Sequence, residues 1–151
     1  MKIVVQRSLK SSVKVDNKVV GSIEHGLVLL VGFTYKDNLD IIDYMVDKVL
    51  NLRIFDDENG IMNKSLLDVG GDILSISQFT LYADSRKGRR PSYVNALNGE
   101  EAIKLYDIFN EKLRSHVKVE TGIFGAEMEV SITNDGPITI ILERTSDQYE
   151  K

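Results

Sequence analysis

The 151-residue sequence contains no cysteine and no tryptophan, and it has only two prolines and two histidines. Without cysteine there is no disulfide, no zinc–thiolate site and no thiol nucleophile. No apolar run approaches the roughly 20 residues that a membrane-spanning helix needs, and the first residues lack a signal-peptide pattern. These absences predict a cytoplasmic protein that makes no membrane contact.

Several catalytic motifs are missing as well. The chain has no Gly-x-Ser-x-Gly, no His-Glu-x-x-His and no phosphate-cradling glycine-rich loop. His25 falls in a turn and His116 ends an expected helix, positions that favour structural or surface roles, so a serine-type triad has no obvious base. The acids of Asp56–Glu58 lack calcium-loop spacing and are interpreted as a solvated turn. We therefore expect neither a metal site nor a cofactor.

The composition is that of one ordinary globular domain. Hydrophobic residues make up 42% of the chain and charged residues 28%, with a net charge of −4. We expect residues 1–151 to form one domain with a polar tail at 143–151. The negative charge argues against a general nucleic-acid coat protein, so any RNA contact has to come from a local basic patch.

Hydrophobic periodicity predicts an α+β fold. Apolar stripes of helical period predict helices at about 38–51 and 98–115. A hairpin is expected around Asp16–Asn17. Continuous or alternating apolar runs predict strands at 2–9, 27–33, 73–76, 126–132 and 138–142.

Polar residues follow the apolar run 73–76, where a core strand would continue with Val, Ile or Leu. Ser77, Gln78 and Thr80 are neutral, and burying each without a partner costs about 1–3 kcal/mol. The strand end therefore either satisfies these groups internally or presents them to a ligand.

The densest basic patch of the chain follows this strand end and comprises Arg86, Lys87, Arg89 and Arg90. It is either a solvated face or a phosphate-binding loop.

Two separated blocks carry a family resemblance. Ser77–Asp84 reads SQFTLYAD, and Asn134–Thr139 reads NDGPIT. Together with 51–55 and 86–92 they make the chain resemble the D-aminoacyl-tRNA deacylases from about residue 6 to 142. The resemblance implies a β-barrel-like antiparallel or mixed sheet flanked by two main helices. It also implies a hydrolase that cleaves the ester of D-aminoacyl-tRNA, releases free D-amino acid and tRNA, and rejects L-aminoacyl-tRNA.

For catalysis, the resemblance points to Ser77, Gln78, Phe79 and Thr80. Backbone N–H groups around the last three could stabilise the oxyanion of an activated ester, with help from the ribose hydroxyl of the substrate. Thr80 acting as a covalent nucleophile is an alternative, but no base is evidently placed to activate it.

For selectivity, the family uses a cis Gly-Pro dipeptide that reaches into the pocket of the partner subunit. Here that implies Gly136 and Pro137, held by Arg7, in a homodimer with composite sites. Met128 and Phe124 are expected to line the pocket. Because such a site rejects L-residues through a steric clash with their side chain, it would also accept glycyl-tRNA, whose amino acid has no side chain.

Two other functions stay open from the residues alone. A non-catalytic nucleic-acid-binding module would rest on the basic patch and show strongly salt-dependent binding. A hydrolase of small D-amino-acid esters or amides would not depend on the RNA portion of the substrate.

Overall fold

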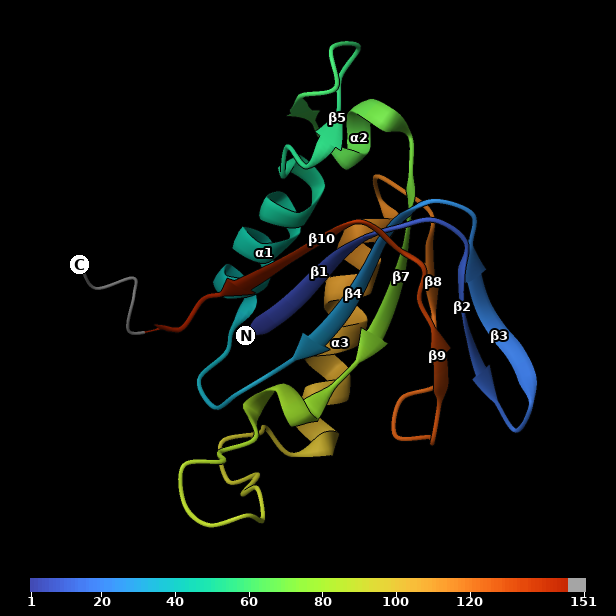
Figure 1. The fold of residues 1–151 in the computed structure, drawn as a ribbon. Helices are drawn as coiled ribbons and strands as arrows, with labels where there is room; N and C mark the ends of the chain where they lie inside the picture. The colour runs from blue at the N-terminus through green and yellow to red at the C-terminus, as the bar shows by residue number, and fades with distance from the viewer. Residues whose placement is uncertain (147–151) are drawn as a thin grey trace.

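The computed structural model describes residues 1–146 and is built around a mixed five-stranded sheet (Figure 1). In this sheet Lys2–Ser8 lies antiparallel to both Asn134–Glu143 and Gly26–Gly32, whereas Asp72–Ser77 runs parallel to Gly26–Gly32 and to Val119–Thr121. In spatial order the strands are β10 (Asn134–Glu143), β1 (Lys2–Ser8), β4 (Gly26–Gly32), β7 (Asp72–Ser77) and β8 (Val119–Thr121).

A second, antiparallel sheet of three strands packs on one face of the first. Its order is β3 (Lys18–Ile23), β2 (Ser11–Val15) and β9 (Glu129–Ser131). The expected hairpin is confirmed, since Asp16 and Asn17 have φ values of 50° and 64°, as a tight turn with two positive φ angles requires. A Cβ at Gly21 would lie 2.6 Å from the Thr121 carbonyl oxygen, so only glycine lets β3 approach β8 this closely.

Two main helices cover the opposite face of the large sheet. α1 (Leu39–Asn51) begins at Asn38, whose side chain accepts the Ile41 N–H at 3.0 Å. α3 (Gly99–Arg114) begins at Asn98, whose side chain accepts the Glu101 N–H. Both helices bury the apolar stripes that the sequence predicts. The remaining short elements are β5 (Phe55–Asp56), β6 (Met62–Lys64), α2 (Leu66–Val69) and the 3-10 helix η1 (Phe79–Tyr82).

Strand alternation divides the core into two layers. Leu27 and Leu29 face the helices, whereas Val28 on the same strand faces the second sheet with Leu74 and Ile76. Both faces of β4 and β7 are therefore buried, which explains their nearly continuous apolar sequences.

The fold confirms the expected class, a single α+β domain with a mixed sheet and two main helices. Within residues 1–146 the sheet is open rather than a closed barrel, because β10 and β8 are its edges. Two of the predicted strands differ from expectation by more than one residue at an end. β9 is shorter, and β10 runs through Gly136–Pro137 because residues on both sides of the dipeptide pair with β1. Glu143, at the start of the predicted tail, belongs to β10, and 147–151 lie outside the described residues.

The helices of residues 1–146 include none with the length and apolarity to cross a bilayer. The longest of them, α3, has 16 residues and carries charged side chains along its exposed face.

Candidate active site

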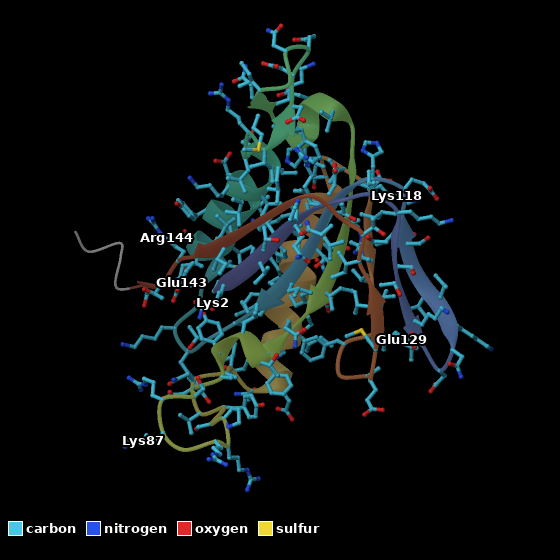
Figure 2. All side chains as sticks on the ribbon, viewed as in Figure 1. Lys2, Lys87, Lys118, Glu129, Glu143 and Arg144 are labelled. Atoms are coloured by element: carbon cyan, nitrogen blue, oxygen red, sulfur yellow. The ribbon has the colours of Figure 1, made fainter. Side chains whose placement is uncertain are left out.

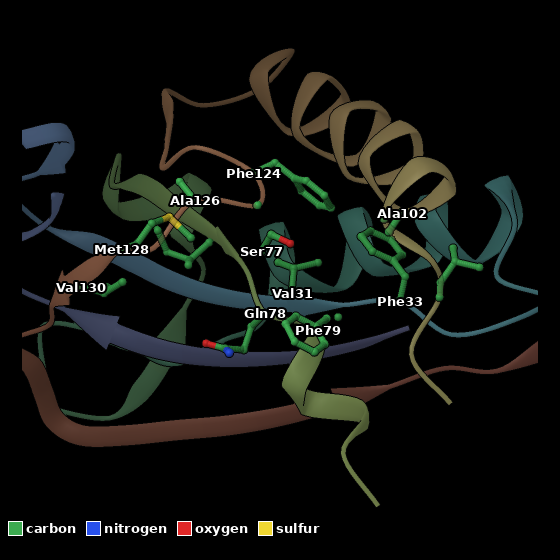
Figure 3. Close-up of a pocket in the computed structure, with 15 residues that line it drawn as sticks. Val31, Phe33, Ser77, Gln78, Phe79, Ala102, Phe124, Ala126, Met128 and Val130 are labelled. Atoms are coloured by element: carbon green, nitrogen blue, oxygen red, sulfur yellow. The ribbon is translucent and has the colours of Figure 1, made fainter. Parts of the chain in front are cut away.

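A cavity of about 480 Å³ opens where β4 and β7 end, beside the first turn of α3 (Figure 3). One wall comes from Val31 and the strand end Ile76–Phe79, and another from the start of α3. The third wall is the segment from Phe124 to Val130. None of its lining residues carries an ionisable side chain. Chemistry in this cavity therefore has to use backbone groups, neutral side chains and the substrate itself.

The strand end presents two unused backbone donors. Gln78, one of the three residues predicted to supply oxyanion donors, donates its N–H to the Val31 carbonyl at 2.8 Å, so this group already has an acceptor in the protein. The chain then turns into η1, whose first N–H groups belong to Phe79 and Thr80. Among the described residues neither N–H has an acceptor, as expected for the first turn of a helix.

The three polar side chains of this segment have different environments. Ser77, the last residue of β7, is half-buried and lines the cavity, and Figure 3 shows its hydroxyl there. Thr80 is not a strand residue, and its hydroxyl accepts a hydrogen bond from the side-chain amide of Gln78. Its hydroxyl is also outside the lining of the cavity. The side chains of Gln78 and Thr80 are thus satisfied by each other, which was one of the two alternatives for this segment.

Phe124 and Met128 both line the cavity, where sequence reasoning had placed them. Phe124 packs against Tyr106 of α3 with ring centroids 5.9 Å apart. The Tyr106 hydroxyl donates to the Ser75 carbonyl at 2.7 Å, and burial raises the pKa of this tyrosine. This wall is therefore anchored to the central sheet.

Gly136 and Pro137 lie far from the cavity of their own chain. Their peptide bond is cis, which confirms that expectation, and both residues are exposed. Strand pairing places the dipeptide on β10 opposite Arg7 of β1, and Arg7 is level with Ile73 of β7. The dipeptide is therefore three strands away from β7 and four residues, measured along the strand, from Ser77. That offset corresponds to roughly 20 Å. One chain therefore does not bring the predicted selectivity and catalytic residues together.

A hydrogen-bond network holds the dipeptide in place. The Asn134 side chain donates to the carbonyls of Arg7 and Ile138, each at 3.0 Å, and accepts from the Thr139 hydroxyl at 3.3 Å. Gly136 has a φ of 122°, which favours glycine. No role for Asn134 is predicted from the sequence, although this residue begins the block that carries the resemblance.

Arg7 lies beside this network and is almost fully buried. Its guanidinium donates to the Ile54 carbonyl at 3.0 Å and lies 3.5 Å from the Asp56 carboxylate. Nε is 3.1 Å from an Asp135 carboxylate oxygen, an ion-pair distance without hydrogen-bond geometry. Arg7 thus tethers the residue that precedes Gly136 to the core.

The basic patch lies on the loop between η1 and α3, and Figure 2 labels Lys87 near its tip. Arg86 pairs with Asp84 at 2.8 and 2.9 Å, and these hydrogen bonds lower the Asp84 pKa to about 2. Lys87, Arg89 and Arg90 are exposed and have no ion pair within residues 1–146. Three of the four predicted cations are therefore free for a polyanion.

The histidines lie away from the cavity. The His25 carbonyl accepts the Asp72 N–H, at the opposite end of β7 from Ser77. His116 follows the last turn of α3, whereas the cavity adjoins the first. Within the described part of the chain, no three His, Cys, Asp or Glu side chains lie close enough to hold a metal.

Comparisons with known proteins show the family and agree with the fold. The family model described as D-Tyr-tRNA(Tyr) deacylase matches residues 4–143. A D-aminoacyl-tRNA deacylase of Clostridium perfringens is 59% identical over 144 residues, covering 95% of this chain and 97% of the relative. One from Bacillus cytotoxicus is 56% identical over 144 residues, covering 95% and 99%. The chain therefore belongs to the D-Tyr-tRNA(Tyr) deacylase family.

Two solved structures share the fold. One, named c-Myc DNA Unwinding Element Binding Protein, is 41% identical with a TM-score of 0.91, covering 97% of this chain and all of the other. A second, described as a probable eukaryotic D-amino acid tRNA deacylase, is 19% identical with a TM-score of 0.79, covering 93% and 97%. At that identity the second likeness concerns the fold alone.

Proposed function

We propose that this protein hydrolyses the ester of D-aminoacyl-tRNA in the cavity at the end of β7, and that the cavity takes the terminal nucleoside carrying the ester. The observation that carries the proposal is a pair of free N–H groups, on Phe79 and Thr80, beside a cavity without ionisable side chains. Its volume of about 480 Å³ falls in the range of small-ligand sites. The whole chain acts as one deacylase domain, in the cytoplasm.

In this mechanism, water attacks the ester carbonyl and the two N–H groups stabilise the oxyanion that forms. Loss of one such donor typically slows catalysis about 10²- to 10³-fold. An aminoacyl ester is already activated, so a positioned water and the neighbouring ribose hydroxyl replace a protein base. The Thr80 hydroxyl makes a poor nucleophile here, because it accepts a hydrogen bond from the Gln78 side chain and no histidine is near. Ser77 helps to position the substrate from the cavity wall.

Selectivity requires a second copy of the chain. The dipeptide Gly136–Pro137 is exposed and roughly 20 Å from its own cavity, so it can limit only the cavity of a partner subunit. We propose a homodimer in which each dipeptide blocks the direction that an L side chain takes from the α-carbon. Glycine has no side chain to block, so glycyl-tRNA is also a substrate. Arg7 supports the dipeptide through Asp135.

Turnover of charged tRNA tests the proposal directly. Catalytic amounts of protein should release D-tyrosine from D-tyrosyl-tRNA and leave L-tyrosyl-tRNA intact. D-tyrosyl methyl ester serves as the control, and slow turnover of it would show that the RNA portion contributes. Equal release from the D- and L-forms contradicts the selectivity, and equal turnover of the methyl ester favours a small-ester hydrolase.

A second candidate function is nucleic-acid binding without catalysis. The free cations of the basic loop favour it, as does the 41% identity to a chain named c-Myc DNA Unwinding Element Binding Protein. Binding of tRNA without multiple turnover would support this alternative. Lys87, Arg89 and Arg90 contact tRNA phosphates under either function.

A further inference from the structure

An exposed aromatic pair lies at the mouth of the cavity. Phe79 lines the cavity, yet 56% of its surface is exposed. Its ring meets that of Tyr93 edge-on, with centroids 5.2 Å apart, and Tyr93 is 44% exposed. Single exposed apolar residues are common on proteins, but two contacting aromatic rings at a cavity mouth form a continuous surface. We call the pair Phe79–Tyr93 the aromatic shelf.

The shelf is held on a fixed backbone. Asp84 and Ser92 exchange backbone hydrogen bonds of 2.7 and 2.9 Å directly before Tyr93. After it, the Ala96 N–H donates to the Tyr93 carbonyl, and the Asn95 carbonyl accepts the Thr34 hydroxyl at 2.6 Å. Tyr93 is therefore positioned on both sides before any ligand arrives, which lowers the entropy lost on binding.

The surroundings of the shelf match a single-stranded nucleic acid. The loop that carries Tyr93 also carries the free cations Lys87, Arg89 and Arg90. Positive charge that follows a phosphate backbone, next to aromatic rings that stack on bases, is the usual combination for binding single strands. The sequence pattern predicts the cations but no role for Tyr93, and for Phe79 it predicts only a backbone role.

We propose that the aromatic shelf binds the penultimate base of the single-stranded acceptor end, by stacking, while the cavity holds the terminal nucleoside. This inference rests on the proposed function, because the nucleoside in the cavity sets which base reaches the shelf. Phe79 belongs to both surfaces, so the two binding positions are one side chain apart. Stacking tolerates any base and so distinguishes an RNA end from a free amino-acid ester without reading sequence.

Substrates of two lengths test the shelf. For Tyr93→Ala, kcat/KM with a D-tyrosyl trinucleotide should fall about 5- to 150-fold relative to D-tyrosyl-adenosine, the range expected for losing one stacked base. An abasic penultimate position should remove this difference. Tyr93→Phe should restore the wild-type ratio, and Tyr35→Ala, which removes an exposed tyrosine outside the cavity lining, should not change it. If Tyr93→Ala lowers kcat/KM equally for the trinucleotide and the adenosine substrate, or for neither, the shelf does not bind the base.

A binding measurement separates the shelf from the catalytic proposal. An uncharged trinucleotide with 2-aminopurine at the penultimate position should lose fluorescence on binding to the wild type and keep it with Tyr93→Ala. Quenching by a protein that hydrolyses nothing would leave the shelf standing and reject the activity. Hydrolysis without quenching would reject the shelf alone. A change in dimerisation with no base-dependent effect would show that Tyr93 contacts a second copy instead, and would also overturn the proposal.

Discussion

The backbone at Gly136 has no room for a side chain. A Cβ there would lie 2.7 Å from Cγ1 of Ile138 and 2.9 Å from its backbone nitrogen, closer than carbon atoms normally approach. The φ of 122° adds a conformation that L-residues rarely adopt, at a cost of about 1–3 kcal/mol. We therefore expect Gly136→Ala to lower the free energy of unfolding by that amount and to move the dipeptide.

Selectivity should suffer more than catalysis in this variant. The cavity and the donors of Phe79 and Thr80 lie roughly 20 Å away in the same chain and are untouched. Moving a pocket wall that excludes one substituent of a substrate typically changes the ratio of the two substrates' kcat/KM values about 10- to 200-fold. Hydrolysis of L-tyrosyl-tRNA should therefore rise by that factor, while hydrolysis of the D-form changes little.

Gly60→Ala is the matched control. Gly60 also has a positive φ, 75°, but a Cβ there would meet no atom within 4 Å. It should destabilise the protein by about 1 kcal/mol and leave the ratio of D to L hydrolysis unchanged. Urea unfolding and single-turnover hydrolysis give the two readouts. A Gly136→Ala protein that is destabilised but keeps wild-type selectivity would refute the role of the dipeptide.

Three further results are expected. Because no ionisable group lines the cavity, kcat/KM should show no enzyme inflection between about pH 5.5 and 9, only that of the substrate's α-ammonium group; a bell-shaped profile would contradict this. Replacing Lys87, Arg89 and Arg90 with alanine should reduce the slope of log Kd against log salt by about 2. Because the Asp84 pKa is lowered to about 2, its pair with Arg86 stabilises the protein above about pH 4 and is lost as the pH falls toward 2. The Tm difference between wild type and Asp84→Asn should therefore shrink over that range.

Local signals in the sequence were sufficient for most of the fold. The stripe that α1 buries and the Asp16–Asn17 turn depend on residues only a few positions apart, so pattern alone predicts them. The end of β7 was harder, because Ser77 continues the strand while Phe79 begins a 3-10 helix, and both conformations suit this sequence. The parallel pairing of β4 with β7 and the open edges depend on long-range contacts that periodicity does not encode.

The candidate site was predictable in part. Phe124 and Met128 line the cavity, and the resemblance had pointed to both as pocket residues, whereas alternation alone could not separate a cavity wall from core. The hydrogen bond from the Gln78 N–H to the Val31 carbonyl could not be predicted, because it depends on the register between β4 and β7. Tyr93 was missed because an isolated tyrosine in a polar loop carries no signal until the fold brings it against Phe79.

Mixed dimers test whether the backbone of one subunit limits the cavity of the other subunit. Ala126 lines the cavity, so Ala126→Trp should fill it and abolish hydrolysis while leaving Gly136 and Pro137 intact. Gly136→Ala protein is exchanged with a tenfold excess of Ala126→Trp protein, and L-tyrosyl-tRNA hydrolysis is measured. With this excess, most Gly136→Ala subunits pair with an Ala126→Trp subunit, whose dipeptide is wild type. If the dipeptide acts across subunits, the open cavities of these mixed dimers regain their selectivity, so L-hydrolysis falls to about a tenth while D-hydrolysis persists. Unchanged L-hydrolysis after complete subunit exchange would contradict the account.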